Sequence, residues 1–425
     1  MKKRIGSLLL LLALLLTALS CGDSRQADAA PEGETTQYPV ALLEASPQAN
    51  ATPTDGGVTL SLATQAQLSA SFRISEGEPN TLCVIRATVD ASALRQADGL
   101  PPTVLLQATS SRDGNAHVIH TEGSPTATGE YTVRRLLLLD ENGEADFSLS
   151  FGKDAQAVQG EVRVSSIRCT PVEQDTDYTV YALDGSTVRF IFLAQDVVTY
   201  GISPAIVREM LHRITNLDTA LRDLTGHDKL WGTHSDVVFT EAIPYTALAG
   251  QPIYVNRAEL SYLIPAMNDE CADRTRPLQQ SDLTALLSHE LSHTYDVAAL
   301  PNEQARYCFD RELFATLKSV YALEASGFPL AADFLSTSPS LSSGMYSHEV
   351  LLSRLLSGIR QAENGWNAVK TALQTLYSTE PLHSPLEAYF AFTDALRAAG
   401  GGAILDTFTP EELAFLENYF FVKSQ

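Results

Sequence analysis

Residues 281–296 read SDLTALLSHELSHTYD, and this stretch predicts a helix built to carry functional side chains. Ser281 can accept the unpaired N–H groups of the first turn, and Asp282 suits the positive end of the helix dipole. Leucines recur along the stretch at helical spacing and give the helix an apolar packing surface: Leu283, Leu286, Leu287 and Leu291.

Two histidines of this helix are spaced for metal binding. His289 and His293 are four residues apart, so they lie one turn from each other on one face. Both imidazoles can therefore reach one ion at about 2.0–2.1 Å. Glu290 is rotated by about 100° from His289, which places its carboxylate beside the ion, where it can take a proton from an attacking water.

A third ligand follows on a second predicted helix. Eighteen residues separate His293 from Glu312, which stands before the apolar residues Leu313, Phe314 and Leu317. A carboxylate there completes a set of two histidines and one glutamate with one position left open, which is the catalytic form of zinc. We therefore predict a zinc cofactor held by His289, His293 and Glu312.

The pattern HExxH-x18-E is the arrangement of the gluzincin metallopeptidases. The segments HELSHTYD (289–296) and DRELFA (310–315) resemble that clan, and the spacing is similar to that of aminopeptidase-N-type enzymes. With AGQPIYVNR (249–257) ahead of the metal helix, the chain looks closer to the enhancin-like, mucin-cleaving metallopeptidases. The resemblance implies that Glu290 is the catalytic base and that the three predicted ligands are those of the family.

Two departures from the family patterns bear on the subfamily. Ser292 stands where many relatives have glycine between the glutamate and the second histidine. The chain also has no GxMEN exopeptidase motif, which favours an endopeptidase over an aminopeptidase. In related enzymes a tyrosine or histidine donates a hydrogen bond to the oxyanion. Tyr346 and His348 in the loop GMYSHEV are the candidates here, and Tyr307 and Tyr321 are weaker ones.

The N-terminus predicts export and a lipid anchor. Lys2, Lys3 and Arg4 precede an apolar run of signal-peptide length, and we expect residues 1–20 to be the signal peptide. Small residues before Cys21 resemble a bacterial lipobox, which implies lipidation of that cysteine and attachment to the cell envelope, at the outer membrane or cell surface. An ordinary signal peptide is the alternative. Residues 21–57 are polar and predict a flexible tether.

Four further cysteines suggest disulfides in an exported chain. Three pairings are possible, and we favour Cys83 with Cys169 and Cys271 with Cys308 because neither crosses the expected domain boundary. No CxxC pair is present, so a zinc site made of these cysteines is not expected.

Residues 58–172 predict an all-β sandwich, similar to a jelly roll. Short alternating segments are separated by turn-rich pieces such as Asp113-Gly114-Asn115. The stretch 146–173 looks like the last strands of carbohydrate-binding jelly rolls of the galactose-binding-like type. Both tryptophans, Trp231 and Trp366, lie outside this region, so a spacer domain is an equal expectation.

Residues 178–425 predict an α+β domain, zincin-like by the resemblance, with a helical C-terminal subdomain. Apolar strands are expected at Val188–Ala194, Val237–Phe239 and Pro252–Val255, and a long helix opens at Ser203-Pro204. Ile253–Asn256 is a candidate edge strand for an extended substrate. A polar linker is expected at Pro171–Asp177, between the two domains.

The net charge of -22 indicates that the chain does not bind nucleic acid. Loss of Lys2, Lys3 and Arg4 would take the charge from -22 to -25. The primary hypothesis is a monomeric, secreted endopeptidase that acts on extracellular proteins or glycoproteins. The alternatives are an aminopeptidase and a cell-surface lipoprotein that binds glycan or protein through the sandwich and has a non-catalytic zincin fold.

Overall fold

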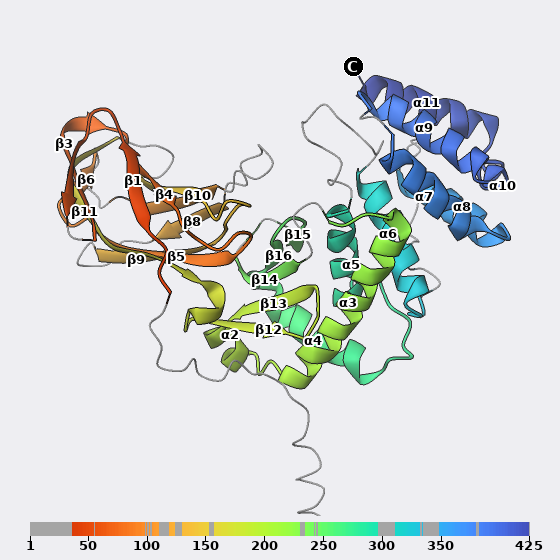
Figure 1. Cartoon of the computed structure of the whole chain (residues 1–425), viewed down its shortest axis with the longest axis horizontal. Coiled ribbons are helices and arrows are strands. Elements are labelled where there is room, and N and C mark those ends of the chain that lie inside the picture. The colour runs from red at the N-terminus through yellow and green to blue at the C-terminus, as the bar shows by residue number, and fades with distance from the viewer. Residues whose placement is uncertain are drawn as a thin grey trace, which may run out of the picture. The chain divides into compact units, whose positions relative to one another are not determined.

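The structure is a computed structural model, and Figure 1 colours it from the red N-terminal strands to the blue C-terminal helices. The described residues are 36–54, 56–97, 99, 102, 104–109, 119–123, 130–152, 157–229, 234–241, 243, 245–295, 311–331, 334, 348–379 and 382–424. The predicted signal peptide and Cys21 lie outside them, and so do Cys308, Tyr307 and Tyr346. No helix in this part of the chain is long and apolar enough to cross a membrane.

The N-terminal part is an antiparallel β-sandwich. One sheet has the strand order β1-β4-β10-β7-β8, and the other has the order β2-β3-β11-β5-β9 with β6 paired to β11. The strands are β1 (Val40–Ala45), β2 (Asn50–Thr54), β3 (Gly57–Ala66), β4 (Leu68–Ile74), β5 (Leu82–Asp90), β6 (Leu94–Gln96), β7 (Val104–Thr109), β8 (Ile119–Gly123), β9 (Glu130–Leu138), β10 (Ala145–Phe151) and β11 (Val158–Pro171).

Alternation of buried and partly exposed residues explains why these segments form strands. In β10, for example, every second residue from Ala145 to Phe151 is buried, which is the period of a strand with one face on the core. Phe147 stacks on Phe72 of the neighbouring strand with ring centroids 5.1 Å apart. The predicted sandwich is therefore present, and every strand expected from alternation is found.

The boundary between tether and sandwich differs from the prediction. We expected a flexible tether over 21–57, but β1 and β2 lie within it and pair with β4 and β3. These strands were missed because neither sequence alternates between apolar and polar residues: β1 (VALLEA) is mostly apolar and β2 (NATPT) is mostly polar. Pairing with neighbouring strands supplies the stabilisation that their sequences do not signal.

Cys83 and Cys169 lie side by side inside the sandwich. They are on the paired strands β5 and β11, both side chains are fully buried, and both are free thiols in the structure. A hydrogen bond with Cys169 and burial raise the pKa of the Cys83 thiol. The favoured pairing therefore joins two residues that the fold brings into contact.

We expect Cys83 and Cys169 to form a disulfide in protein recovered from an oxidising compartment. The bond should add about 2–4 kcal/mol to the free energy of unfolding. Non-reducing peptide mapping checks the bond, and urea unfolding with and without reductant checks its contribution. Two alkylatable thiols at Cys83 and Cys169 in the exported protein would contradict the prediction; cytoplasmically expressed protein is the control.

The C-terminal part contains a mixed sheet with the order β12-β13-β14-β16-β15. Its strands are β12 (Tyr178–Ala182), β13 (Val188–Leu193), β14 (Ser235–Glu241), β15 (Ala247–Leu248) and β16 (Ile253–Asn256). The central pairs β13–β14 and β14–β16 are parallel, whereas β12 and β15 pair antiparallel with β13 and β16. The expectation that Ile253–Asn256 is the edge strand is therefore wrong, because the two-residue strand β15 covers it.

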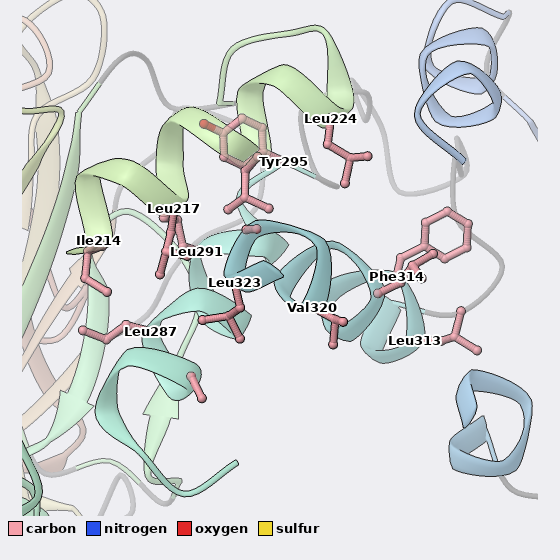
Figure 2. Close-up of a cluster of buried hydrophobic side chains, with 14 of the residues drawn as sticks. Ile214, Leu217, Leu224, Leu287, Leu291, Tyr295, Leu313, Phe314, Val320 and Leu323 are labelled. Atoms are coloured by element: carbon pink, nitrogen blue, oxygen red, sulfur yellow. The ribbon is translucent and has the colours of Figure 1, made fainter. Parts of the chain in front are cut away.

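The helices are α2 (Ala194–Thr199), α3 (Pro204–Thr225), α4 (Leu260–Ala272), α5 (Leu283–His293), α6 (Arg311–Ala325), α7 (His348–Gln361), α8 (Gly365–Tyr377), α9 (Pro385–Ala398), α10 (Gly402–Leu405) and α11 (Pro410–Lys423). Helices α2 and α3 lie between β13 and β14 in the chain, and the other helices follow β16. Figure 2 shows Leu217 of α3, Leu291 of α5 and Leu323 of α6 meeting in one apolar core. This core packs α3, α5 and α6 against one another.

The mixed sheet is buried on both faces. In β13, Phe190 and Phe192 belong to the core shared with the helices, whereas Ile191 points to the opposite face. There it packs with Leu82 and Leu136 of the sandwich strands β5 and β9. The sandwich thus contributes directly to the core of the C-terminal part.

The expected linker is part of this interface. A 3-10 helix, η2 (Val172–Gln174), occupies its start, and Val172 is fully buried. The buried carboxylate of Asp175 accepts two hydrogen bonds from Arg86 of β5, at 2.5 and 2.9 Å. Arg135 of β9 also pairs with Glu241 at the end of β14. The prediction of a polar linker is therefore wrong for its central residues.

Candidate active site

The helix that carries both histidines begins at Leu283, two residues later than expected. Ser281 was predicted to cap it, but the residue before the helix is Asp282, whose side chain accepts the Gln279 N–H at 2.8 Å instead. The capping group comes from α4, where the buried Glu270 accepts the N–H groups of Leu283 at 2.6 Å and Thr284 at 3.1 Å. A carboxylate at this end also suits the helix dipole.

Replacement of Glu270 by Ala is expected to lower the free energy of unfolding by about 1–3 kcal/mol, because two buried N–H groups of α5 would lose their acceptor. Urea unfolding measures the change. Asp269→Ala is the matched control, since Asp269 is the exposed neighbour on the same helix. Equal effects of the two substitutions would argue that Glu270 does not cap α5.

Helix α6 packs closely against α5. Ser288 is fully buried in α5, and its hydroxyl donates to the Ser319 carbonyl of α6 at 3.5 Å. Ser292 is also fully buried and donates to the Ser288 carbonyl at 2.7 Å. The small side chain of Ser288 therefore lies at the contact between α5 and α6, whereas Ser292 bonds within its own helix.

The approach of α6 brings Glu312 to the two histidines. Nε2 of His289 lies 3.1 Å from Oε2 of Glu312 and 3.2 Å from Nε2 of His293, and Nε2 of His293 lies 3.5 Å from Oε1 of Glu312. Hydrogen bonds from His289 and His293 lower the pKa of the Glu312 carboxyl. One ligand atom from each side chain falls within a cluster that could hold a metal ion.

The side chains suit a metal ion in chemistry. Two imidazoles and one carboxylate are ligands that zinc accepts. The two imidazole nitrogens lie 3.2 Å apart, and the two carboxylate oxygens of Glu312 each lie near one of them, at 3.1 and 3.5 Å. One ligand atom from each side chain lies within 4.8 Å of the others. The donor set therefore fits the predicted zinc ion in chemistry, and its members lie close together.

Glu290 lies on the same helix and faces the strand β15. Burial raises the pKa of its carboxyl, while His289, His293 and the backbone N–H of Ala249 act in the opposite direction. Ala249 directly follows β15, so its hydrogen bond fixes the carboxylate between the helix and the end of the edge strand. Glu290 thus stands beside the three candidate ligands and outside their cluster.

The pairing register shows which groups β15 leaves open. Asn256 N–H donates to the Thr246 carbonyl at 2.9 Å, so these two residues form a hydrogen-bonded pair. Pairs in an antiparallel ladder alternate, and the next residue, Ala247, therefore turns its N–H and carbonyl away from β16. These groups point away from β16, on the same side as the N–H of Ala249, and β15 is the last strand of this sheet among the described residues.

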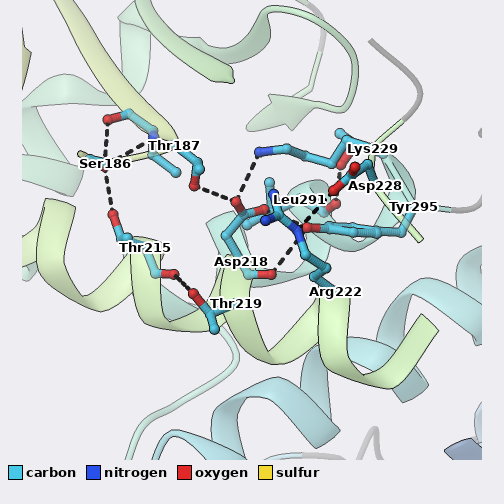
Figure 3. Close-up of polar contacts among 12 residues, drawn as sticks. Ser186, Thr187, Thr215, Asp218, Thr219, Arg222, Asp228, Lys229, Leu291 and Tyr295 are labelled. Atoms are coloured by element: carbon cyan, nitrogen blue, oxygen red, sulfur yellow. Dashed lines mark hydrogen bonds and ion pairs between the residues drawn. The ribbon is translucent and has the colours of Figure 1, made fainter. Parts of the chain in front are cut away.

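A polar network anchors the other end of the metal-site helix. Tyr295, two residues beyond His293, is fully buried and donates to Oδ1 of Asp218 at 2.8 Å (Figure 3). Asp218 of α3 also pairs with the buried Lys229 at 3.0 Å and accepts a hydrogen bond from Thr187 at 2.5 Å. The chain leaving α5 is thus fixed to α3.

Several sequence-predicted residues are not at this site or are not described. Tyr321 donates to Asp223 at 2.9 Å and packs on Trp366, and it lies about 13 Å along α6 from Glu312. It is therefore no oxyanion donor. Tyr346, the side chain of His348 and Asp296 lie outside the described residues, as does the Cys308 partner expected for Cys271.

Three contributors were missed from the sequence: Glu270, Ala249 and Thr316, whose hydroxyl lies 3.3 Å from Nδ1 of His289. A signal existed only for Thr316, because it follows Glu312 by one helical turn and so shares its face.

No family model matches this sequence, and no curated protein matches it. Similar solved structures include the CBM22-1 xylan-binding domain of Xyn10C from Paenibacillus barcinonensis, at 14% identity over 32% of this chain and 85% of that chain, with a TM-score of 0.20. The C-terminal CBM6 of LamC from Zobellia galactanivorans matches at 15% identity over 31% and 99%, also with a TM-score of 0.20.

The enzymatically active domain of bacteriophage CBA120 tailspike protein 4 matches at 12% identity and a TM-score of 0.21, over 32% of this chain and only 19% of that one. None of these three structures is named as a peptidase. At such scores the likeness carries no conclusion about ligand or activity, so the functional argument rests on the site.

Proposed function

We propose that this chain is a zinc-dependent endopeptidase. The observation that carries the proposal is the cluster of His289, His293 and Glu312, whose ligand atoms lie within 4.8 Å of one another, next to the partly buried Glu290. A structural ion pair would not need the second imidazole, and a metal site without turnover would not need Glu290. The combination favours hydrolysis.

When bound, zinc supplies Lewis-acid polarisation of a carbonyl and of an attacking water. His289, His293 and Glu312 hold the ion. Glu290 accepts the proton of the attacking water and passes it to the leaving amine. The Ala249 N–H keeps the Glu290 carboxylate directed to this position, because it donates from the end of the neighbouring strand.

The position of β15, the last strand of this sheet among the described residues, supports a peptide as the substrate. The N–H and carbonyl of Ala247 can pair with the main chain of an extended peptide, as an added strand does. Main-chain pairing recognises an internal segment and needs no free terminus, which favours an endopeptidase over an aminopeptidase. We extend the proposal to extracellular proteins or glycoproteins as substrates and to an exported lipoprotein anchored through Cys21.

A cleavage assay on the purified mature chain tests the proposal. The panel contains mucin-type glycoproteins, unglycosylated proteins and a peptide library, and mass spectrometry locates the new termini. Chelator-treated enzyme and the Glu290→Gln variant are run beside it. Internal cuts that vanish in both controls are the expected result, and the cut sites show whether glycans matter.

Two results would contradict the proposal. Protein that binds no zinc would overturn the metal site. Stoichiometric zinc without any cleavage would favour the alternative of a surface lipoprotein that binds glycan or protein, and cuts restricted to free N-termini would favour an aminopeptidase.

A further inference from the structure

A threonine of α6, Thr316, contacts the candidate metal ligand His289 at Nδ1. Thr316 lies one turn after Glu312, so its side chain leaves the same face of α6 that supplies the carboxylate. Its hydroxyl oxygen lies 3.3 Å from Nδ1 of the partly buried His289. Glu312 and Thr316 therefore contact opposite nitrogens of one imidazole.

The arrangement indicates which ring nitrogen of His289 binds the ion and which one carries the proton. Nε2 of His289 faces Glu312 and His293 at 3.1 and 3.2 Å, in the cluster where an ion would bind. A ligand nitrogen must carry a lone pair, so the proton of the neutral ring belongs on Nδ1. The N–H at Nδ1 then donates to the hydroxyl oxygen of Thr316, which has lone pairs to accept it.

This contact differs from the usual bond of a threonine inside a helix. The hydroxyls of Thr219 in α3, Thr371 in α8 and Thr375 in α8 donate to the carbonyl four residues earlier in their own helix. The bond of Thr316 instead joins two helices and ends on a functional side chain.

We propose that Thr316 is a positioning residue that fixes the tautomer and the orientation of His289 for zinc. The inference rests on the proposed zinc site and adds a residue to it. A ligating histidine is held by the group that accepts its other N–H, and loss of such a partner costs about 10–100-fold in metal affinity. Here the acceptor is a neutral hydroxyl supplied by the helix that also supplies the third ligand.

The test measures zinc affinity by competition with a chelator at neutral pH, with zinc alone as the probe. Thr316→Val keeps the shape and removes the acceptor, and it should weaken zinc binding about 10–100-fold. Thr316→Ser keeps the hydroxyl and should stay within about threefold of the wild type. Thr371→Val, an exposed helical threonine on α8, is the matched control and should leave the affinity unchanged.

The outcomes separate this inference from the proposed function. If the wild type binds zinc and Thr316→Val binds it with the same affinity, the positioning role is overturned and the zinc site stands. Equal weakening of zinc binding by Thr316→Val and Thr316→Ser also overturns the role. A wild type that binds no zinc overturns both the site and the role. Weaker zinc binding in Thr316→Val, with wild-type affinity kept in Thr316→Ser, supports the positioning role even if no peptide is cleaved. Thermal unfolding of the metal-free variants checks that all are folded.

Discussion

Replacement of Glu290 by Gln is expected to slow peptide hydrolysis about 100- to 10,000-fold while zinc stays bound. The amide keeps the size of the side chain, but it cannot accept the proton of the attacking water. The three predicted ligands are untouched, because Glu290 lies beside their cluster and not in it. Steady-state cleavage of a mapped peptide, with zinc content by elemental analysis, measures both quantities.

Two comparisons make this result specific. Glu417→Gln changes an exposed glutamate of α11 and should leave the cleavage rate unchanged. His293→Ala should lose zinc and activity together, because it removes a predicted ligand. Full activity in Glu290→Gln would contradict the assignment of Glu290 as the catalytic base. Loss of zinc in Glu290→Gln would place Glu290 among the ligands.

The features that the sequence predicted correctly depend on local periodicity. Alternation located β4 and β10, and helical spacing located α3 and the helices that carry His289 and Glu312. The small spacing between the two histidines fixed their common face, since four residues make about one helical turn. The meeting of Glu312 with the histidines was predicted from its place on a second helix and from the family resemblance, and the side chains do lie 3.1 and 3.5 Å apart.

The features that were missed depend on contacts between distant segments. Glu270 caps α5 from another helix, and no local pattern distinguishes it from an exposed glutamate. The two-residue strand β15 is too short for alternation to be visible, and it exists because β16 offers an unpaired edge. Val172 and Asp175 looked like linker residues because their partners lie in the sandwich and in the neighbouring sheet.

Replacement of Asp218 by Asn is expected to lower the free energy of unfolding by about 3–5 kcal/mol. Asp218 and Lys229 are both about 2% exposed, so the ammonium group would be left buried without its counter-charge. Thr187 and Tyr295 would also exchange a charged acceptor for a neutral one. Urea unfolding at neutral pH measures the loss.

The double variant Asp218→Asn/Lys229→Met separates charge from packing. It removes both charges and keeps side chains of similar size, so it should be more stable than Asp218→Asn alone. If the loss of stability in the double variant equals the sum of the losses in Asp218→Asn and Lys229→Met, the two buried charges do not depend on each other. Asp228→Asn, at a neighbouring exposed carboxylate, is the control and should change the stability by less than about 1 kcal/mol.

The pH dependence of the Asp218→Asn variant adds a second, independent check. Burial lowers the pKa of Lys229, while the Asp218 carboxylate opposes that shift. Without Asp218 the folded protein holds the lysine proton more weakly than the unfolded chain does. Stability should therefore rise as the pH increases from neutral toward the usual pKa of lysine, since the unfolded state then binds more protons. Because Tyr295 joins this network directly beyond His293, zinc affinity should fall with the same substitution and recover in part as the pH rises.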